Sequence, residues 1–207
     1  MLKSQVFPNL WKQKNRLLEA KHLFSTVLDC QRNTHGELHE DVGAALHNVG
    51  LVHLRLNEHA QALDYFERAV RVRKGSLGRE HPEVALSQVK VGISLLLMHN
   101  FDMALHAFLE ALSIRKRALG ALHPSLARVY NNIACVHVEF NELREARRAF
   151  EAALDIQRNA LCHEPDSGPL MFGAATTLCN LGYLYRYREM HEKAALVLKE
   201  ALSVSFW

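Results

Sequence analysis

The chain has 207 residues, of which 49% are hydrophobic and 23% are charged, a balance that excludes intrinsically disordered and collagen-like proteins. The 25 Lys and Arg residues against 22 Asp and Glu residues leave a formal net charge of only +3, so bulk charge gives no support for binding to a polyanion. The longest apolar run, Val91–Met98, is far shorter than the ~18 residues that span a bilayer, and no membrane segment is expected.

The start of the chain and the cysteines favour a cytoplasmic location. The first residues lack the run of ~7 to 15 apolar residues that a signal peptide needs. The four cysteines are scattered and form no CxxC pair. We therefore expect reduced thiols in a cytoplasmic protein.

A period of 42 residues runs through the sequence. It relates three columns of small and aromatic residues, namely Ala62, Ala104 and Ala146; Phe66, Phe108 and Phe150; and Gly50, Gly92 and Ala134. A fourth copy, shifted by six extra residues, supplies Gly182, Ala194, Leu198 and Ala201. Apolar residues within each unit have helical spacing, so each unit is predicted to be two α-helices. Because one such unit cannot bury its apolar face alone, successive units must stack.

In chain order, the predicted elements are an irregular N-terminal segment (1–15), a half repeat (16–38) and four full repeats (39–80, 81–122, 123–168 and 169–207). The irregular segment follows from Pro8, which stands one period before Gly50 and would cost roughly 3 kcal/mol inside a helix. We expect at most a short helical turn at residues 10–15, followed by a long helix from Arg16 to about Asn33.

Turn and cap residues recur in the same frame. Asn57 and Asn141 are predicted to lie in the turn between the two helices of a unit. Gly78 and Gly120 are predicted to end the second helices in the left-handed conformation. The segment 162–169 carries the six extra residues together with turn-forming residues, and it is expected to be a protruding loop.

At these residues the sequence resembles the tetratricopeptide repeat, in the 42-residue form of kinesin light chains and related scaffolds. The resemblance is carried by residues 48–50 (NVG), 62–69 (ALDYFERA) and 119–124 (LGALHP), and it extends over residues 16–207. It implies an all-α, right-handed α-solenoid whose first helices line a concave groove for partner proteins.

A helical wheel at 100° per residue leaves a second face on each first helix, about 140° from its core stripe. We predict that this face binds a partner peptide. The candidate groove residues are His47, Asn48, Leu51, Arg55, Lys90, Ile93, Leu97, Arg128, Asn131, Asn132, Cys135, Asn180, Tyr183 and Arg186. The same wheel adds Leu54, Val89, Leu96, Glu139, Cys179 and Tyr187. The apolar middle of this face and its excess of positive charge favour a short peptide with an apolar anchor and acidic flanks. The resemblance to kinesin light chains implies the same class of ligand.

Packing offers an alternative for part of this face. Asn48, Asn132 and Asn180 share one column, and they would also be explained if they tied neighbouring helices together, because buried polar groups need partners. Leu51, Ile93 and Leu97 would equally fit ordinary packing in a shallow groove.

The basic runs 71–74 and 115–117 do not indicate a nucleic-acid partner. Each run lies in the last turn of a predicted helix, where the helix dipole favours positive charge by about 0.3 to 1 kcal/mol. Neither run is interleaved with the aromatic residues on which bases of a single strand would stack.

Catalytic, metal and cofactor sites are not expected. His39, His81 and His123 fall in separate loops, which argues against a shared metal ion. Cys135 and His137 stand two residues apart on a helix and point to different faces. No GxGxxG, phosphate-binding loop or paired-carboxylate pattern is present. The sequence therefore predicts a noncatalytic adaptor without a cofactor.

A second hypothesis concerns assembly. The last repeat ends on Phe206 and Trp207, whereas a solenoid normally ends in a helix with a polar outer face. The alternative function is therefore an assembly segment of a longer or self-associating repeat protein, without a peptide ligand, in which Phe206 and Trp207 are the candidate contacts.

Overall fold

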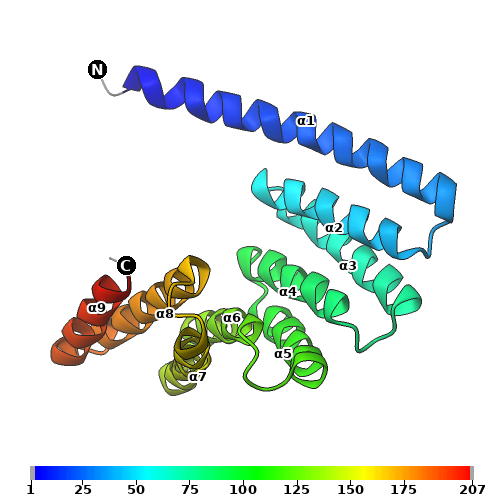
Figure 1. Cartoon of the computed structure of the whole chain (residues 1–207). Helices are drawn as coiled ribbons and strands as arrows, with labels where there is room; N and C mark the ends of the chain where they lie inside the picture. Colours follow the sequence, from blue (N-terminus) through cyan, green and yellow to red (C-terminus); the bar gives the residue numbers. More distant parts are fainter. Residues whose placement is uncertain (1–2, 206–207) are drawn as a thin grey trace. The chain divides into compact units, whose positions relative to one another are not determined.

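The structure is a computed structural model that describes the backbone of residues 3–205 and the side chains of residues 15–203. These residues form nine α-helices and no strand (Figure 1). The helices are α1 (Lys3–His35), α2 (Glu40–Arg55), α3 (His59–Ser76), α4 (Pro82–Leu97), α5 (Phe101–Leu119), α6 (Ser125–Glu139), α7 (Leu143–His163), α8 (Gly168–Tyr187) and α9 (His191–Ser205). The predicted all-α solenoid class is confirmed. The chain divides into two compact units, one up to Asn100 with α1 to α4 and one from Phe101 with α5 to α9.

Small residues of the repeat columns allow close approach of paired helices. A Cβ atom placed on Gly50 would lie only 2.7 Å from Cε1 of Phe66, and one on Gly182 only 2.8 Å from Cδ2 of Leu198. In real structures such distances force a neighbour to move. The Gly50 column therefore marks the place where the second helix of a repeat packs against the backbone of the first.

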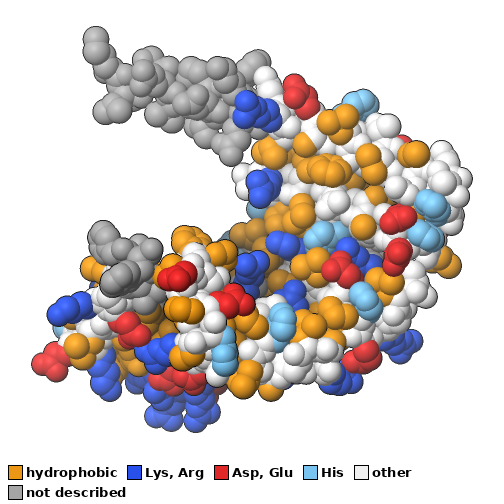
Figure 2. Space-filling model, viewed as in Figure 1, with side chains coloured by type: hydrophobic (Ala, Val, Ile, Leu, Met, Phe, Trp, Pro, Cys, Tyr) orange, Lys and Arg blue, Asp and Glu red, His pale blue; other side chains and the backbone are white. Residues whose placement is uncertain are grey.

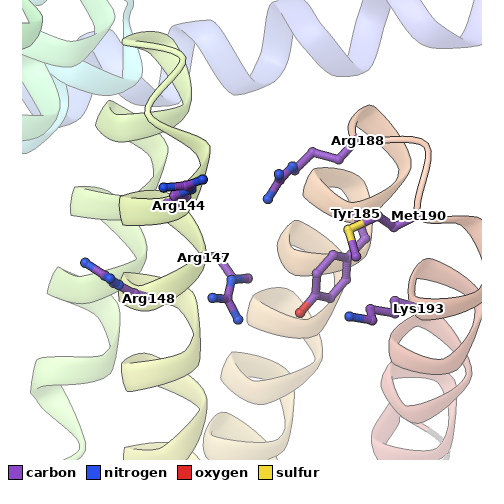
Figure 3. Close-up of a pocket in the computed structure, with 7 residues that line it drawn as sticks. All are labelled: Arg144, Arg147, Arg148, Tyr185, Arg188, Met190 and Lys193. Atoms are coloured by element: carbon purple, nitrogen blue, oxygen red, sulfur yellow. The ribbon is translucent and has the colours of Figure 1, made fainter.

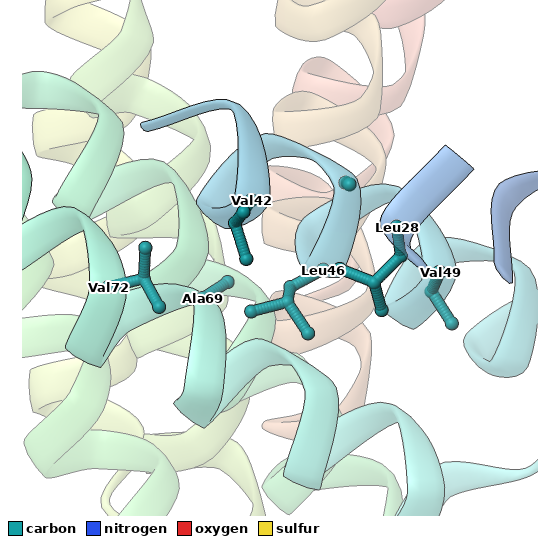
Figure 4. Packing of buried hydrophobic residues seen from close by; sticks show 7 residues of the cluster. Leu28, Val42, Leu46, Val49, Ala69 and Val72 are labelled. Atoms are coloured by element: carbon teal, nitrogen blue, oxygen red, sulfur yellow. The ribbon is translucent and has the colours of Figure 1, made fainter. Parts of the chain in front are cut away.

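The core of the first unit joins three consecutive helices (Figure 4). Its buried cluster takes Leu28 from α1, residues Val42, Leu46 and Val49 from α2, and residues Ala69 and Val72 from α3. Phe24 and Tyr65 pack against this cluster. Helix α1 thus covers an apolar side of α2, in the position where the second helix of a preceding repeat would pack.

The N-terminal prediction is wrong for residues 3–15. Helix α1 begins at Lys3 and includes Pro8, so residues 10–15 are not limited to a single turn. A proline removes one backbone hydrogen bond from a helix, and in the second turn of a helix as long as α1 that local cost does not end the helix.

The turns match the predictions. Asn57 and Asn141 have φ angles of 60° and 59°, in the left-handed region, and Gly78 and Gly120 both have φ of 90° just after α3 and α5. Glu189 occupies the position of Asn141 in the last repeat, with φ of 57°.

The six extra residues do not form a protruding loop. Helix α7 continues to His163 and α8 begins at Gly168, so only residues 164–167 connect them. With 21 and 20 residues, α7 and α8 are longer than the other repeat helices. The insertion therefore extends the two helices, and it adds a turn of helix surface to α8.

Candidate partner-binding site

Helix α8 presents a stripe of exposed aromatic side chains in the second unit. Phe172, Tyr183 and Tyr187 are 77%, 57% and 63% exposed, and Cys179 is exposed between them. At 100° per residue Phe172 and Tyr183 point in nearly the same direction. Figure 2 shows hydrophobic side chains exposed over α8. Large exposed apolar side chains along one side of a helix are typical of a site that contacts another molecule.

Positive charge lies beside the aromatic stripe. The guanidinium carbon of Arg186 lies 5.4 Å from the centre of the Tyr183 ring, a cation–π arrangement that holds the charge next to the apolar surface. Arg128 on α6 is exposed as well. An acidic group close to an apolar anchor would find a cation at this place.

Asn131 connects α6 to α8, and its side chain is half-buried. Its Nδ2 donates to Oγ1 of Thr177 at 2.7 Å and to the backbone oxygen of Ala127 at 3.1 Å. The sequence suggested that Asn132 could tie neighbouring helices together. In the structure the preceding residue, Asn131, makes such a contact. Asn132 and Asn180, which share one column of the repeat, are half-buried.

His47 is part of the interior, and its assignment to the groove is wrong. Its side chain is 6% exposed, and Nδ1 lies 3.1 Å from Oγ of Ser87, which joins α2 to α4. Burial, followed by the charges of Arg73 and Lys90, lowers the pKa of His47 to about 3. The imidazole is neutral at physiological pH and serves packing between repeats.

The first unit shows a smaller apolar face on α2 and α4. Leu51 and Ile93 are half-buried, while Leu97 is exposed. Of the predicted cations, Arg55 is exposed and Lys90 is half-buried, as is the neighbouring Asn48. The apolar side chains of this face are less accessible than those of α8.

Cys135 has the environment of a packing residue. Its side chain is half-buried, and burial, together with the nearby charge of Glu139, raises the pKa of the thiol. A thiol that stays protonated is a weak nucleophile.

The candidate assembly contacts Phe206 and Trp207 lie outside the described residues.

The periodic histidines have a structural role that the sequence reading missed. Nδ1 of His39 accepts from the backbone N–H of Asp41 at 3.3 Å, and His81 accepts from Glu83 at 3.2 Å. Each histidine therefore caps the first helix of its repeat. Its position directly before a helix start was the available signal. Among the described residues, no group of three or more side chains is placed to hold a metal ion.

Phe172 was also missed, because its repeat differs in length from the others. The helical wheel was aligned on the shorter first helices, and the insertion extends α8 beyond that frame.

Within the described part of the chain, no helix combines the length and the apolarity needed to cross a membrane.

Comparison with known proteins places these features in a family. The sequence profile of the tetratricopeptide repeat matches residues 10–75 and 76–159, and a second profile of the same repeat matches residues 175–206. No curated protein matches the sequence. Among solved structures, BtubC (BKLC) from P. vanneervenii superimposes with a TM-score of 0.81 at 19% identity, over 95% of this chain and 76% of that chain.

Two further structures have the same fold. The TPR-like repeats of a putative kinesin light chain from Podosopora anserina have a TM-score of 0.73 at 19% identity, over 95% of this chain and 90% of that chain. The apo form of RapI has a TM-score of 0.76 at 17% identity, over 96% and 68%. Since repeat profiles match most of its length, this chain belongs to the tetratricopeptide repeat family, with repeats similar to those of kinesin light chains.

Proposed function

We propose that the chain is a protein-interaction scaffold that binds a partner peptide, with an apolar anchor and acidic flanks, on the exposed face of α8. The repeat fold and its structural relatives support the scaffold role. The observation that carries the peptide site is the exposed stripe of Phe172, Tyr183 and Tyr187 with Arg186 against the Tyr183 ring.

The magnitudes indicate which groups dominate binding. Each apolar side chain that the peptide buries contributes about 1.5 to 3 kcal/mol, whereas an exposed ion pair adds about 0 to 1 kcal/mol. The aromatic stripe should therefore set the affinity. Arg128 and Arg186 should set specificity and association rate, with Glu139 as the opposing charge on the same face.

Fluorescence anisotropy tests this site. The probes are two pools of labelled short peptides with a central Trp, one flanked by Asp and Glu and the other by Lys. We expect the acidic pool to bind more tightly, and Tyr183→Ser to weaken it about tenfold, since 1.4 kcal/mol corresponds to that factor. Leu196→Ser on α9, where the leucine is 69% exposed, is the matched control. Equal affinity of the two pools, or equal loss in both variants, would reject the proposal.

A second candidate, assembly with another repeat, rests on Leu202. Its counterparts one, two and three repeats earlier are Leu154, Leu112 and Val70, all buried, whereas Leu202 is 59% exposed. Leu154 packs with Leu178 of the following helix α8, so Leu202 offers the surface on which a further repeat would stack. Light scattering should then detect a concentration-dependent dimer that Leu202→Glu abolishes. A monomer at every concentration, for wild type and variant alike, would reject self-association.

The noncatalytic character, the cytoplasmic location and the exclusion of nucleic acid remain predictions from the sequence. They are compatible with the proposed scaffold and independent of the α8 experiment. The face of the first unit that includes Leu97 and Arg55 is proposed as a weaker binding site for the same class of peptide, because less of its apolar surface is accessible.

A further inference from the structure

A basic cavity lies in the second unit, at the edge where α7 and α9 begin and α8 ends (Figure 3). Its volume is about 270 Å³, and four arginines, Lys193, Tyr185 and Met190 line it without any carboxylate. Figure 3 shows Arg147 and Arg188 directed into the gap between α7 and α8, with the Tyr185 hydroxyl and Lys193 opposite, while Arg148 points to the other side of α7. Figure 2 shows Lys and Arg side chains gathered over α7.

The repeat architecture does not require these cations. At the positions equivalent to Arg144, Arg147, Arg148, Arg188 and Lys193, none of the other three full repeats has Lys or Arg. The position of Arg144, for example, is occupied by Asp102 one period earlier, and that of Lys193 by Glu145. The charge has accumulated only here, where the second helix of the third full repeat lies beside the last repeat.

The last repeat lacks a carboxylate that the first and third full repeats have, while the second full repeat has Asn100 at that position. In the first full repeat, Nδ1 of His53 lies 2.5 Å from Oε2 of Glu58, and in the third His137 and Glu142 make the same contact at 2.7 Å. The equivalent residues in the last repeat are Tyr185 and Met190, which both line the cavity. An acid that would neutralise the arginines is thus replaced by an uncharged side chain.

Most of these cations are not neutralised within the chain. Arg147 pairs with Glu151 at 2.9 Å, but within the part of the chain that the structure describes, Arg144, Arg188 and Lys193 form no ion pair. Arg144 also lies in the first turn of α7, where the helix dipole disfavours positive charge. This placement costs stability, in contrast to the basic runs at the ends of α3 and α5.

We propose that this cavity binds the phosphate monoester of a phosphorylated serine or threonine in a partner protein. Guanidinium groups bind phosphate oxygens in pairs, and a dianionic phosphate offers three acceptor oxygens to converging donors. The Tyr185 hydroxyl supplies a further donor beside Lys193. A single carboxylate would balance only one of the available charges.

The residues next to the lining cations in sequence favour a single phosphate over a nucleic acid or a membrane. Glu145, Glu189 and Glu192 are exposed and adjacent in sequence to the lining cations. A nucleic-acid backbone or an anionic bilayer presents many negative charges at once and requires a continuous basic surface. An isolated phosphate, flanked by neutral or basic residues, fits a small basic cavity whose lining cations are next to exposed acids in sequence. This site is separate from the aromatic stripe of α8, and the two proposals stand independently.

The test measures anisotropy of the full chain with a labelled degenerate peptide library that has one fixed phosphoserine. The other arms are the same library without phosphate, inorganic phosphate as competitor, and vesicles that contain a phosphatidylinositol phosphate. We expect binding of the phosphorylated library alone, competition by inorganic phosphate, and preference for basic over acidic flanks. Arg144→Glu with Arg188→Glu should weaken binding about tenfold or more, because hydrogen bonds to charged groups are lost.

The matched control reverses two exposed arginines of the first unit, Arg71→Glu with Arg79→Glu. Equal weakening by both double variants would show a general charge effect and overturn the proposal. Equal binding of the two libraries, or binding of the vesicles without the peptides, would overturn it as well. Circular dichroism checks the fold, and Lys193→Gln, a milder change of an exposed side chain, provides a second test of the same loss.

Discussion

Arg73 donates from Nη1 to the backbone oxygen of Glu83 at 2.9 Å, and its Nη2 lies 2.8 Å from the Glu83 carboxylate. The same Nη1 also donates to Oγ of Ser87 at 2.7 Å. One period later, Arg115 donates to the backbone oxygen of Ser125 at 2.9 Å. Both arginines are buried, so each joins the end of one repeat to the first turn of the next. The basic runs thus include residues that connect repeats, beyond the favourable dipole interaction expected from sequence.

Replacing Arg73 by Met should destabilise the chain by about 2 kcal/mol. Met fills much of the volume but leaves the Glu83 oxygen and Ser87 without their charged donor, and a hydrogen bond to a charged group is worth roughly 1.5 to 3 kcal/mol. Urea denaturation measures the change in the free energy of unfolding. The exposed neighbour Arg71 gives the control, and Arg71→Met should stay within about 0.5 kcal/mol. A similar small effect of Arg73→Met would contradict the inter-repeat role.

Gly50→Ala tests the nesting of small and aromatic residues. The new Cβ would meet Phe66 at 2.7 Å, and overpacking of this kind typically costs about 1 to 3 kcal/mol. Combining Gly50→Ala with Phe66→Leu should recover part of that loss, so the two changes should couple favourably in a double-mutant cycle of unfolding free energies. Additive effects would show that the ring and the glycine are not in tight contact.

The sequence predicted the repeat columns and the turns because the residues that form them recur. A fixed step relates Gly50 and Phe66, and the left-handed turn residues Asn57 and Gly78, to their counterparts in other repeats. A small residue or a turn residue that recurs in this way indicates close packing or a turn at that position. Features that occur once were predicted poorly. Pro8 was given too much weight, and the insertion before α8 was read as a loop because its turn-forming residues outnumber its helix formers.

Stability should fall in mild acid because of His47. Its pKa is about 3 in the folded chain and about 6.5 when unfolded. Below pH ~6.5 the unfolded chain takes up a proton that the folded chain does not, so the free energy of unfolding falls by about 1.4 kcal/mol per pH unit towards pH ~3. Above that range His47 contributes no pH dependence.

Urea denaturation near neutral pH and near pH 5 isolates this contribution. The loss on acidification should be smaller in His47→Gln than in the wild type. His106, which is exposed, provides the control, since His106→Gln should leave the difference unchanged. An identical pH dependence in all three proteins would refute the assignment of a neutral, buried His47.

Glu189→Asn should stabilise the last repeat by about 0.5 to 1 kcal/mol. Glu189 has φ of 57°, a conformation that is costly for most residues but tolerated by Asn, which stands at the equivalent positions 57 and 141. Thermal unfolding should show a higher midpoint. High salt separates the backbone effect from the removal of a charge next to Arg188, and a gain that disappears in high salt would contradict the conformational explanation.

The candidate site was harder to predict than the fold. A helical wheel assigns direction but not depth, so it placed both the exposed Tyr183 and the buried His47 on the binding face. The basic cavity depends on Arg144 and Arg188, which are far apart in sequence, and each alone resembles an ordinary solvated charge. Only the packing of α7, α8 and α9 brings them together.

Photo-crosslinking tests the central claim most directly. An acid-flanked peptide with a benzophenone at its apolar anchor is irradiated with the full chain, and the linked residues are mapped by mass spectrometry. The account predicts links to α8 around Phe172 and Tyr183, which Tyr183→Ser reduces. Links confined to α9 around Leu196 and Leu202, or spread evenly over the surface, would contradict it.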